Sequence, residues 1–284
     1  MGKQQADADI GRLVDAALAE DVGDGDLTAA LLPPTARLDA AVIARQAAVL
    51  CGQPWFDAVF ARLDPAIKIE WLKRDGDRIE AGDKLVRLHG PAAAMLTGER
   101  TALNFLQTLS ATATAARRYV EAVAGTGVTI LDTRKTIPGL RSAQKYAVRC
   151  GGASNHRIGL FDAILIKENH IAAAGGIRPA ADAAARAGVL VEIEVENLAQ
   201  LEEALGTTVS RVLLDNFELD GLRAAVALRD RLAPEIGLEA SGGITLASVR
   251  AVAETGVDFI SVGEITKDID AVDLSMRFEA AAGG

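Results

Sequence analysis

The chain from Val128 onward alternates between short apolar segments and longer amphipathic ones. Six segments have the length and the apolar, β-branched composition of buried strands. They are VTILD (128–132), AILIK (163–167), VEIEV (191–195), RVLLD (211–215), LEAS (238–241) and DFISVG (258–263). Amphipathic helices fit between them, at about 139–150, 172–187, 198–205, 218–232 and 246–254. This repeated strand–helix unit predicts a parallel sheet, either open and doubly wound or closed as a barrel.

The first third of the chain has a different pattern, which predicts a small α+β domain. An apolar stripe from Asp9 onward predicts a helix, and Pro54–Leu63 predicts a short helix with proline in its first turn. Residues 38–50 and 67–72 are expected to be strands. Two Asp-Gly pairs within 74–90 predict tight hairpins of an antiparallel sheet.

A long helical stretch, 96–123, separates these two patterns. We therefore expect an N-terminal α+β domain over 1–113, in which helix 96–113 leads to the barrel, and a barrel domain over 114–272. The tail, 273–284, contains DLSMRFEAA and is expected to form a C-terminal helix that returns to the N-terminal domain.

The residues at the strand ends favour the barrel over the open sheet. Every predicted strand ends in a functional group: Asp132 followed by Arg134 and Lys135, then Lys167, Glu194, Asp215, Ser241 with Gly242 and Gly243, and Gly263. Such groups surround the mouth of an α/β barrel, whereas an open sheet gathers them at one switch point. With about six strands instead of eight, the barrel is expected to be incomplete and open.

Positive charge is concentrated in one part of an acidic chain. Between Asp132 and Arg178 there are eight Lys or Arg and three acids, a net charge of +5 within a chain of −9. This contrast indicates a site for a small, highly anionic ligand and argues against nucleic-acid binding. The basic candidates are Arg134, Lys135, His156, Arg157 and Lys167. The alternative is that they are solvated surface charges.

Two acids and two glycine turns complete the predicted mouth. Glu194 and Asp215 each end an apolar strand without a nearby His or Cys, and oxygen-only ligands favour Mg²⁺. The alternative is a pair of buried acids neutralised by the lysines. Glu192 points the same way as Glu194 by strand alternation, but it lies further from the strand end. The SGGI turn at 241–244 and the SVGE turn at 261–264 offer backbone amides to a phosphate, the first before a helix near Thr245.

Other residue patterns bound the class of protein. Cys51 and Cys150 have no metal or CxxC spacing and are expected to be buried thiols in a reducing compartment. No apolar run approaches a membrane span, and the N-terminal residues lack the apolar core of a signal peptide. We expect a cytoplasmic protein. No Ser-His-Asp or Cys-His arrangement is evident, which disfavours covalent nucleophilic catalysis.

The chain strongly resembles the quinolinate phosphoribosyltransferases, also called carboxylating nicotinate-nucleotide pyrophosphorylases. The resemblance extends from about residue 19 to 266 and rests on eight segments. These are AEDVGDGDLT, GERTALNFLQ, DTRKTIPGLR, KYAVRCGGASNHRIGLFDAILIKENHI, VEIEVENLAQ, VLLDNF, EASGGIT and DFISVGEIT. It implies a Mg²⁺-dependent reaction of quinolinate with phosphoribosyl pyrophosphate that gives nicotinate mononucleotide, pyrophosphate and CO₂ in NAD biosynthesis. It also implies a dimer with shared sites.

The resemblance also assigns expected roles to residues. Arg134, His156, Arg157 and Lys167 match the pocket for the quinolinate dicarboxylate, and Lys135 and Lys167 match groups near the pyrophosphate. Glu194 and Asp215 match acids at the ribose and the metal. Ser241, Gly242, Gly243 and Gly263 match the cradle of the 5′-phosphate, and Arg100 matches an arginine that the neighbouring subunit contributes. Lys135, Lys167, Glu194 and Asp215 are the expected catalytic residues.

Two other functions stay open at this point. One is a paralogue associated with molybdate transport, which shares DTRKTIPG but lacks the lysine of LIKENH, so Lys167 favours the quinolinate enzyme. The other is a non-catalytic protein that binds a phosphorylated metabolite, which would not require both Glu194 and Asp215.

Overall fold

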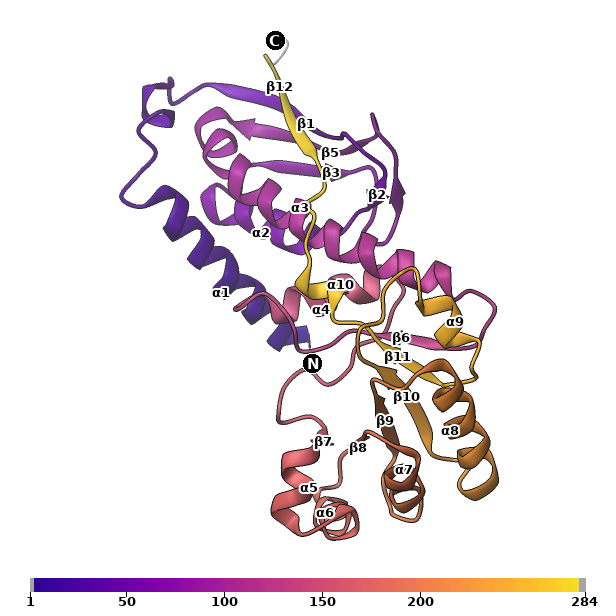
Figure 1. Cartoon of the computed structure of the whole chain (residues 1–284). Coiled ribbons are helices and arrows are strands. Elements are labelled where there is room, and N and C mark those ends of the chain that lie inside the picture. The colour runs from indigo at the N-terminus through magenta and orange to yellow at the C-terminus, as the bar shows by residue number, and fades with distance from the viewer. Residues whose placement is uncertain (1–2, 281–284) are drawn as a thin grey trace. The chain divides into compact units, whose positions relative to one another are not determined.

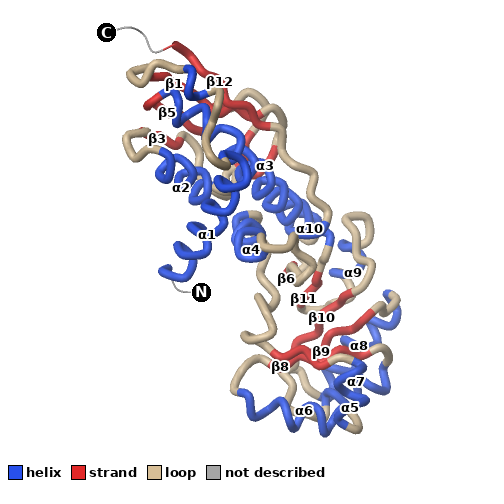
Figure 2. The backbone as a smooth tube through the Cα atoms, turned by 90° about the vertical axis from the view of Figure 1, so that its left-hand side faces the viewer, coloured by secondary structure: helices blue, strands red, loops and turns tan. Residues whose placement is uncertain are grey.

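The structure is a computed structural model in which residues 3–280 are described. The chain divides into two compact units. Of the described residues, 3–115, 137–152 and 268–280 belong to the first unit, and 116–136 and 153–267 belong to the second. Each unit has its own sheet and its own helices (Figures 1 and 2).

An antiparallel four-stranded sheet forms the centre of the first unit, in the order β12-β1-β5-β3. Its strands are β1 (Arg37–Ala44), β3 (Lys68–Trp71), β5 (Lys84–Pro91) and β12 (Leu274–Ala280), while β2 (Ala48–Val49) pairs with β4 (Arg78–Ile79). The helices are α1 (Lys3–Val22), α2 (Gln53–Leu63), α3 (Ala92–Ala122) and α4 (Arg141–Cys150), with a 3-10 turn at Ala29–Leu31. The last turns of α3, from residue 116, belong to the second unit. Helices α2 and α3 lie along one face of the sheet (Figure 1). The predicted α+β domain is confirmed.

The predicted C-terminal helix is wrong where the structure describes it, because Leu274–Ala280 is a strand. It pairs antiparallel with β1, from Ala44↔Leu274 to Leu38↔Ala280. Leu274 and Met276 are buried in alternation with more exposed neighbours, which is the period of a strand. So short a segment fits helix and strand patterns alike, and the free edge of β1 decides between them. Residues 281–284 lie outside the described residues.

Helix α4 belongs to the first unit, whereas the sequence pattern placed it among the barrel helices. Its Ala143 and Ala147 are fully buried in the first unit's core, and the Tyr146 ring meets the Trp55 ring edge-on with centroids 5.4 Å apart. A strand–helix alternation along the chain does not say which sheet a helix covers.

The second unit contains a parallel six-stranded sheet in the order β6-β11-β10-β9-β8-β7. Its strands are β6 (Thr129–Leu131), β7 (Ile164–Ile166), β8 (Val191–Val195), β9 (Arg211–Asp215), β10 (Gly237–Ser241) and β11 (Phe259–Ser261). The helices are α5 (Glu168–Ala174), α6 (Ile177–Ala184), α7 (Leu198–Leu205), α8 (Leu219–Leu232), α9 (Val249–Ala253) and α10 (Glu264–Lys267), with a 3-10 turn at Ala185–Ala187. One helix expected at about 172–187 is divided where Gly175 and Gly176 take positive φ.

The strand order confirms an open α/β barrel. The first strand, β6, pairs with the last, β11, which is barrel order and not the order of a doubly wound sheet. In the described residues the ladder is interrupted between β6 and β7, where a single parallel bridge joins Leu131 to Ser154. Helices α5 to α8 lie outside the sheet (Figure 2). Their apolar faces contain buried residues such as Leu201 of α7 and Leu222 of α8.

No helix within residues 3–280 combines the length and the apolar character that crossing a membrane requires.

Candidate active site

The carboxyl ends of the second unit's strands bring four predicted site residues to one edge. Parallel pairing aligns Ile166 with Ile193, Glu194 with Leu213, and Ser241 with Asp215. Lys167, Glu194, Asp215 and Ser241 therefore lie at the same end of neighbouring strands. This is the arrangement that the sequence pattern predicts.

Lys167 and Glu194 form an ion pair at this edge. The Lys167 Nζ lies 2.5 Å from the Glu194 Oε2, and the two side chains are 43% and 12% exposed. For Glu194 the structure thus agrees with the alternative in which a lysine neutralises the acid. Because the pair is accessible, an anion and a cation from solution can take the places of the two partners.

Three basic residues of the second unit lie in loops that follow β6: Arg134 and Lys135 directly after the strand, and Arg157 before β7. Arg134 and Lys135 are exposed, and the Lys135 main chain is held at both ends. Its N–H donates to Thr133 Oγ1 at 3.0 Å, and its carbonyl accepts from Thr266 Oγ1 at 2.8 Å. Burial lowers the pKa of Arg157, and the positive charge of Arg134 lowers that pKa further. The two guanidinium groups are thus near enough to repel each other, which favours an anionic ligand between them.

Asp132 organises the loop that carries His156 and Arg157. It is fully buried at the end of β6 and accepts from the Asn155 side-chain amide at 2.7 Å and from the His156 N–H at 2.9 Å. The His156 Nδ1 in turn accepts the Arg157 N–H at 2.7 Å. The aspartate noted at the strand end therefore positions the loop, and the His156 ring holds the main chain of Arg157.

Two glycine turns lie at the ends of β10 and β11. Gly242 and Gly243 have φ of 102° and 57°, and a Cβ added at Gly242 would lie 2.1 Å from Asn216 Oδ1. A Cβ added at Gly263 would lie 2.9 Å from Lys135 Cδ. Glycine is therefore favoured by conformation at Gly242, whereas a Cβ at Gly263 would have to displace the exposed Lys135 side chain. The expected helix near Thr245 begins later, at Val249, while α10 follows Gly263 directly.

Asp215 is tied to this turn through the next residue. The Asn216 side-chain amide donates to Asp215 Oδ2 at 2.8 Å, and the Asn216 N–H donates to the Ser241 carbonyl at 2.9 Å. Asn216 has φ of 56°, the only positive φ of a non-glycine residue in the described part of the chain. The carboxylate at the end of β9 and the glycine turn after β10 therefore form one unit of structure.

A buried charged cluster lies below the strand ends, and sequence reasoning missed most of it. The His156 Nε2 is 2.8 Å from Glu192 Oε2 and 3.6 Å from Glu239 Oε1, and both acids are fully buried. Arg211 reaches Glu239 at 2.9 Å and Glu192 at 3.9 Å, and its guanidinium lies 3.8 Å from the centre of the Phe259 ring. A charged residue within an otherwise apolar strand is the signal that could have identified Arg211 and Glu239.

The pKa values of this cluster are displaced by burial and by the neighbouring charges. Burial and the charge of Glu192 raise the pKa of Glu239 to about 7. Burial opposes the charged forms of His156 and Glu192, but their mutual contact raises the pKa of His156 and lowers that of Glu192. Displaced pKa values in a buried polar cluster are typical of functional sites.

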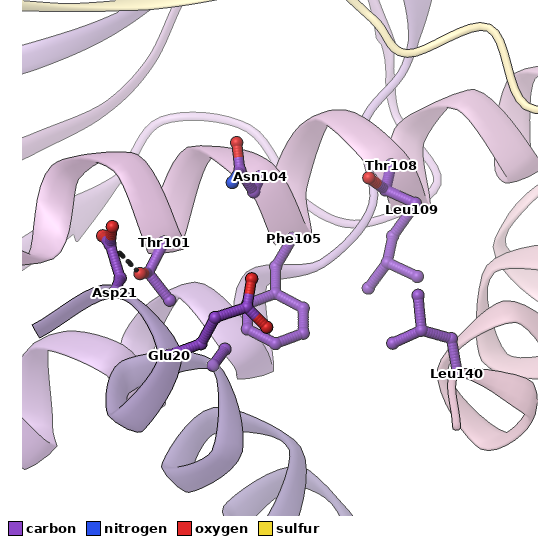
Figure 3. A pocket seen from close by; sticks show the side chains of 9 residues that line it. Glu20, Asp21, Thr101, Asn104, Phe105, Thr108, Leu109 and Leu140 are labelled. Atoms are coloured by element: carbon purple, nitrogen blue, oxygen red, sulfur yellow. Dashed lines mark hydrogen bonds between the residues drawn. The ribbon is translucent and has the colours of Figure 1, made fainter. Parts of the chain in front are cut away.

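Arg100, the remaining predicted site residue, is exposed on α3 in the first unit. The next residue, Thr101, donates to Asp21 Oδ2 at 3.2 Å and lines a pocket of about 180 Å³. Figure 3 shows Asp21, Glu20 and Thr101 at one end of this pocket and Leu109 and Leu140 at the other. Arg100 belongs to the first unit, and the strand-end residues belong to the second.

Comparisons with known proteins agree over nearly the whole chain. The family models for the N-terminal and C-terminal domains of quinolinate phosphoribosyl transferase match residues 26–110 and 112–277. Probable carboxylating nicotinate-nucleotide pyrophosphorylases are similar to this chain: that of Synechocystis sp. is 41% identical over 92% of this chain and 89% of its own, and that of Bacillus subtilis is 42% identical over 90% and 89%. The solved nicotinate-nucleotide pyrophosphorylase from Francisella tularensis is 46% identical, with a TM-score of 0.93 over 96% of this chain and 97% of its own.

Proposed function

Because the chain belongs to the quinolinate phosphoribosyltransferase family, we propose that it is a carboxylating nicotinate-nucleotide pyrophosphorylase. It transfers the phosphoribosyl group of phosphoribosyl pyrophosphate to quinolinate and releases pyrophosphate and CO₂. The product, nicotinate mononucleotide, belongs to the de novo synthesis of NAD.

The observation that carries the proposal is the pair of guanidinium groups of Arg134 and Arg157. Burial is the main cause of the lowered pKa of Arg157 and the positive charge of Arg134 adds to it, so an anion beside the two groups would be stabilised. Quinolinate has two adjacent carboxylates, and arginine binds carboxylates through two parallel hydrogen bonds. Lys167 supplies a further cation once it leaves Glu194. His156 contributes to this pocket through its ring, which holds the Arg157 main chain.

The phosphoribosyl substrate is assigned to the other strand ends. At Gly243 nothing lies within 4 Å of the position of a Cβ, so a 5′-phosphate can approach the main chain there, while Asn216 borders Gly242 and Lys135 borders Gly263. The Lys135 side chain packs against Gly263, and its ammonium is thereby directed to the same region. Lys135 and Lys167 stabilise the negative charge that develops on the departing pyrophosphate.

Glu194 and Asp215 fit a magnesium ion by their chemistry. They are oxygen donors at the ends of neighbouring strands, and within residues 3–280 neither is grouped with a His or Cys that could share a metal ion. Glu194 is partly exposed and Asp215 is half-buried, so both can contact a solvated ion. We propose that they hold Mg²⁺ or the ribose hydroxyls. When bound, the ion neutralises charge on the pyrophosphate.

The residues on hand suffice for the reaction without a dedicated base. Arginine forks hold quinolinate so that its ring nitrogen faces C1 of the ribose, which reacts through an oxocarbenium-like transition state. Alkylation makes the ring nitrogen cationic. The adjacent carboxylate then leaves as CO₂, because the remaining carbanion is stabilised as an ylide, and this carbon takes up a proton from water to give nicotinate mononucleotide.

We further propose a homodimer in which Arg100 completes the site of the neighbouring subunit, and a cytoplasmic location. The dimer proposal is supported by the exposure of Arg100 on α3. The location is supported by the acidic composition and by the two cysteines, which form no disulfide.

One assay tests the function. Purified protein is incubated with quinolinate, phosphoribosyl pyrophosphate and Mg²⁺, and both CO₂ and nicotinate mononucleotide are measured. We expect equal amounts of the two, and none when nicotinate replaces quinolinate. Product formation from nicotinate, or no product from folded protein, would contradict the assignment.

A further inference from the structure

The two cysteines of the chain meet in the first unit, although 98 residues separate them in sequence. Cys51 is fully buried directly after the short strand β2, and Cys150 is the last residue of α4 and partly exposed. Their sulfur atoms and a carboxylate oxygen of Asp75 all lie within 4.8 Å of one another. Three segments distant in sequence therefore build one site with two thiols.

The main chain on both sides of this site is fixed by hydrogen bonds. The Cys51 N–H donates to Ser110 Oγ at 2.9 Å, and that hydroxyl donates back to the Cys51 carbonyl at 3.2 Å. At the end of α4, the Gly151 N–H donates to the Ala147 carbonyl at 2.9 Å. With the main chain held, the two sulfur atoms, which lie within 4.8 Å of each other, would close to a disulfide bond of about 2.05 Å chiefly by rotation of the side chains.

The two thiols are electrostatically different. Burial raises the pKa of Cys51, and its hydrogen bond to Cys150 raises it further. The same hydrogen bond lowers the pKa of Cys150, and the charge of Arg149 acts in the same direction. Cys150 is therefore both the more accessible sulfur and the better nucleophile, whereas Cys51 stays protonated until its partner reacts.

The neighbouring carboxylate favours thiol chemistry over metal binding. Asp75 accepts from the Gly52 N–H at 3.0 Å and from the Tyr146 hydroxyl at 2.8 Å, and it also accepts from the Gln53 N–H at 3.3 Å. Its lone pairs are largely occupied by these donors, so it is a poor third ligand for a cation.

We propose that Cys51 and Cys150 are a redox-active dithiol, which a peroxide converts to an intramolecular disulfide. The Cys150 thiolate attacks one peroxide oxygen, forms a sulfenic acid and releases hydroxide. The Cys51 sulfur then attacks the Cys150 sulfur, the S–S bond forms, and the sulfenic oxygen leaves as water with the proton of Cys51. Two thiols lose two electrons, and the peroxide is reduced to two waters.

The test uses the full chain in its folded state. Reduced protein is treated with hydrogen peroxide at neutral pH, remaining thiols are blocked, and proteolytic peptides are analysed without reduction. We expect a peptide pair joined through Cys51 and Cys150, and dithiothreitol should separate the pair again. A Cys51→Ser variant should accumulate sulfinic acid at Cys150 about tenfold faster than the unaltered protein, since no second thiol captures the sulfenic acid. In a Cys150→Ser variant, Cys51 should remain a thiol.

Circular dichroism establishes that each variant is folded, and Cys51→Ala replaces Cys51→Ser if the hydroxyl disturbs the buried position. Disulfides between molecules, or oxidation of Cys150 to sulfinic acid at the same rate with and without Cys51, would overturn the proposal. A separate arm adds Zn²⁺ alone to the reduced protein. One zinc ion retained per chain with both thiols protected from alkylation would also overturn it, because the site would then bind a metal.

Discussion

The protein should lose stability as the pH rises from mildly acidic to mildly basic values. Replacing Glu239 by glutamine should make most of this loss disappear. Glu239 is fully buried among Glu192, His156 and Arg211. Glutamine has the same shape and resembles the protonated acid, so the change eliminates one titration while keeping the packing. The prediction therefore isolates a single proton in the cluster below the strand ends.

The sign and size follow from proton linkage. The pKa of Glu239 is about 7 in the folded protein, against an ordinary value of 4.5. Its contribution to stability is therefore complete below pH 4.5 and is lost as the pH rises through 7. The full loss is roughly 3 kcal/mol, and roughly 2 kcal/mol of it falls between about pH 5.5 and 8. The raised pKa of His156 acts in the same direction, whereas the lowered pKa of Glu192 affects stability only at more acidic pH.

The measurement is urea unfolding at several pH values, followed by far-ultraviolet circular dichroism. Fluorescence alone is unsuitable, because both tryptophans, Trp55 and Trp71, belong to the first unit. The Glu239→Gln variant should reduce the loss between about pH 5.5 and 8 from roughly 2 to less than about 1 kcal/mol. Glu235→Gln is the matched control: it is the same chemical change at an exposed position on the same unit, and it should leave the slope unaltered.

A wild-type stability that is constant or rises over this pH range would refute the reasoning. So would a Glu239→Gln variant whose pH dependence equals that of wild type. Either result would mean that Glu239 is ionised throughout the range, held by Arg211.

Three further predictions concern the proposed active site. Arg134→Ala and Lys135→Ala should each lower kcat by about 10²–10³-fold, since each removes a cation that faces substrate charge. The control is Lys84→Ala, which changes an exposed lysine of the first unit. Wild-type turnover in the Arg134 or Lys135 variant would contradict the assignment. Gly242→Ala should raise the KM for phosphoribosyl pyrophosphate about tenfold or more, because the new Cβ would lie 2.1 Å from Asn216 Oδ1. Gly125→Ala, also at positive φ but with open space around it, should leave that KM unchanged. Mixing inactive Arg100→Ala and Arg134→Ala proteins should restore up to about a quarter of wild-type activity, because about half of the dimers are mixed and each mixed dimer has one intact site of two. No recovery despite subunit exchange would exclude a shared site.

Periodicity along the chain was sufficient to predict the second unit's strands. Segments such as VEIEV and RVLLD are short, apolar and β-branched, and each forms a strand at the predicted place. Strand ends were equally informative, because parallel strands must direct those ends to one edge. The strand ends predict Lys167 and Glu194 at one mouth but in its basic and acidic halves, whereas the structure joins them in an ion pair.

Periodicity failed where tertiary contacts decide. The pattern of Leu274–Ala280 did not say that the edge of β1 was free to pair with it, and that of α4 did not say which core would receive Ala143 and Ala147. The approach of Cys51 to Cys150 depends on how three segments pack. The pattern of one segment does not say which distant segment it contacts, so these features can be identified only in the structure.

Glu192 and Glu194 lie two residues apart on one face of β8, but their burial and their ion-pair partners differ. Glu192 is 1% exposed and paired with His156, while Glu194 is 12% exposed and paired with Lys167. Removing the partner of Glu192 would leave a buried charge without compensation, which is strongly destabilising. Removing the partner of Glu194 would leave a carboxylate that water or a cation can reach. Only the outer acid can therefore lose its lysine without leaving a buried, uncompensated charge, whereas the inner acid is fixed to His156, whose ring accepts the Arg157 N–H.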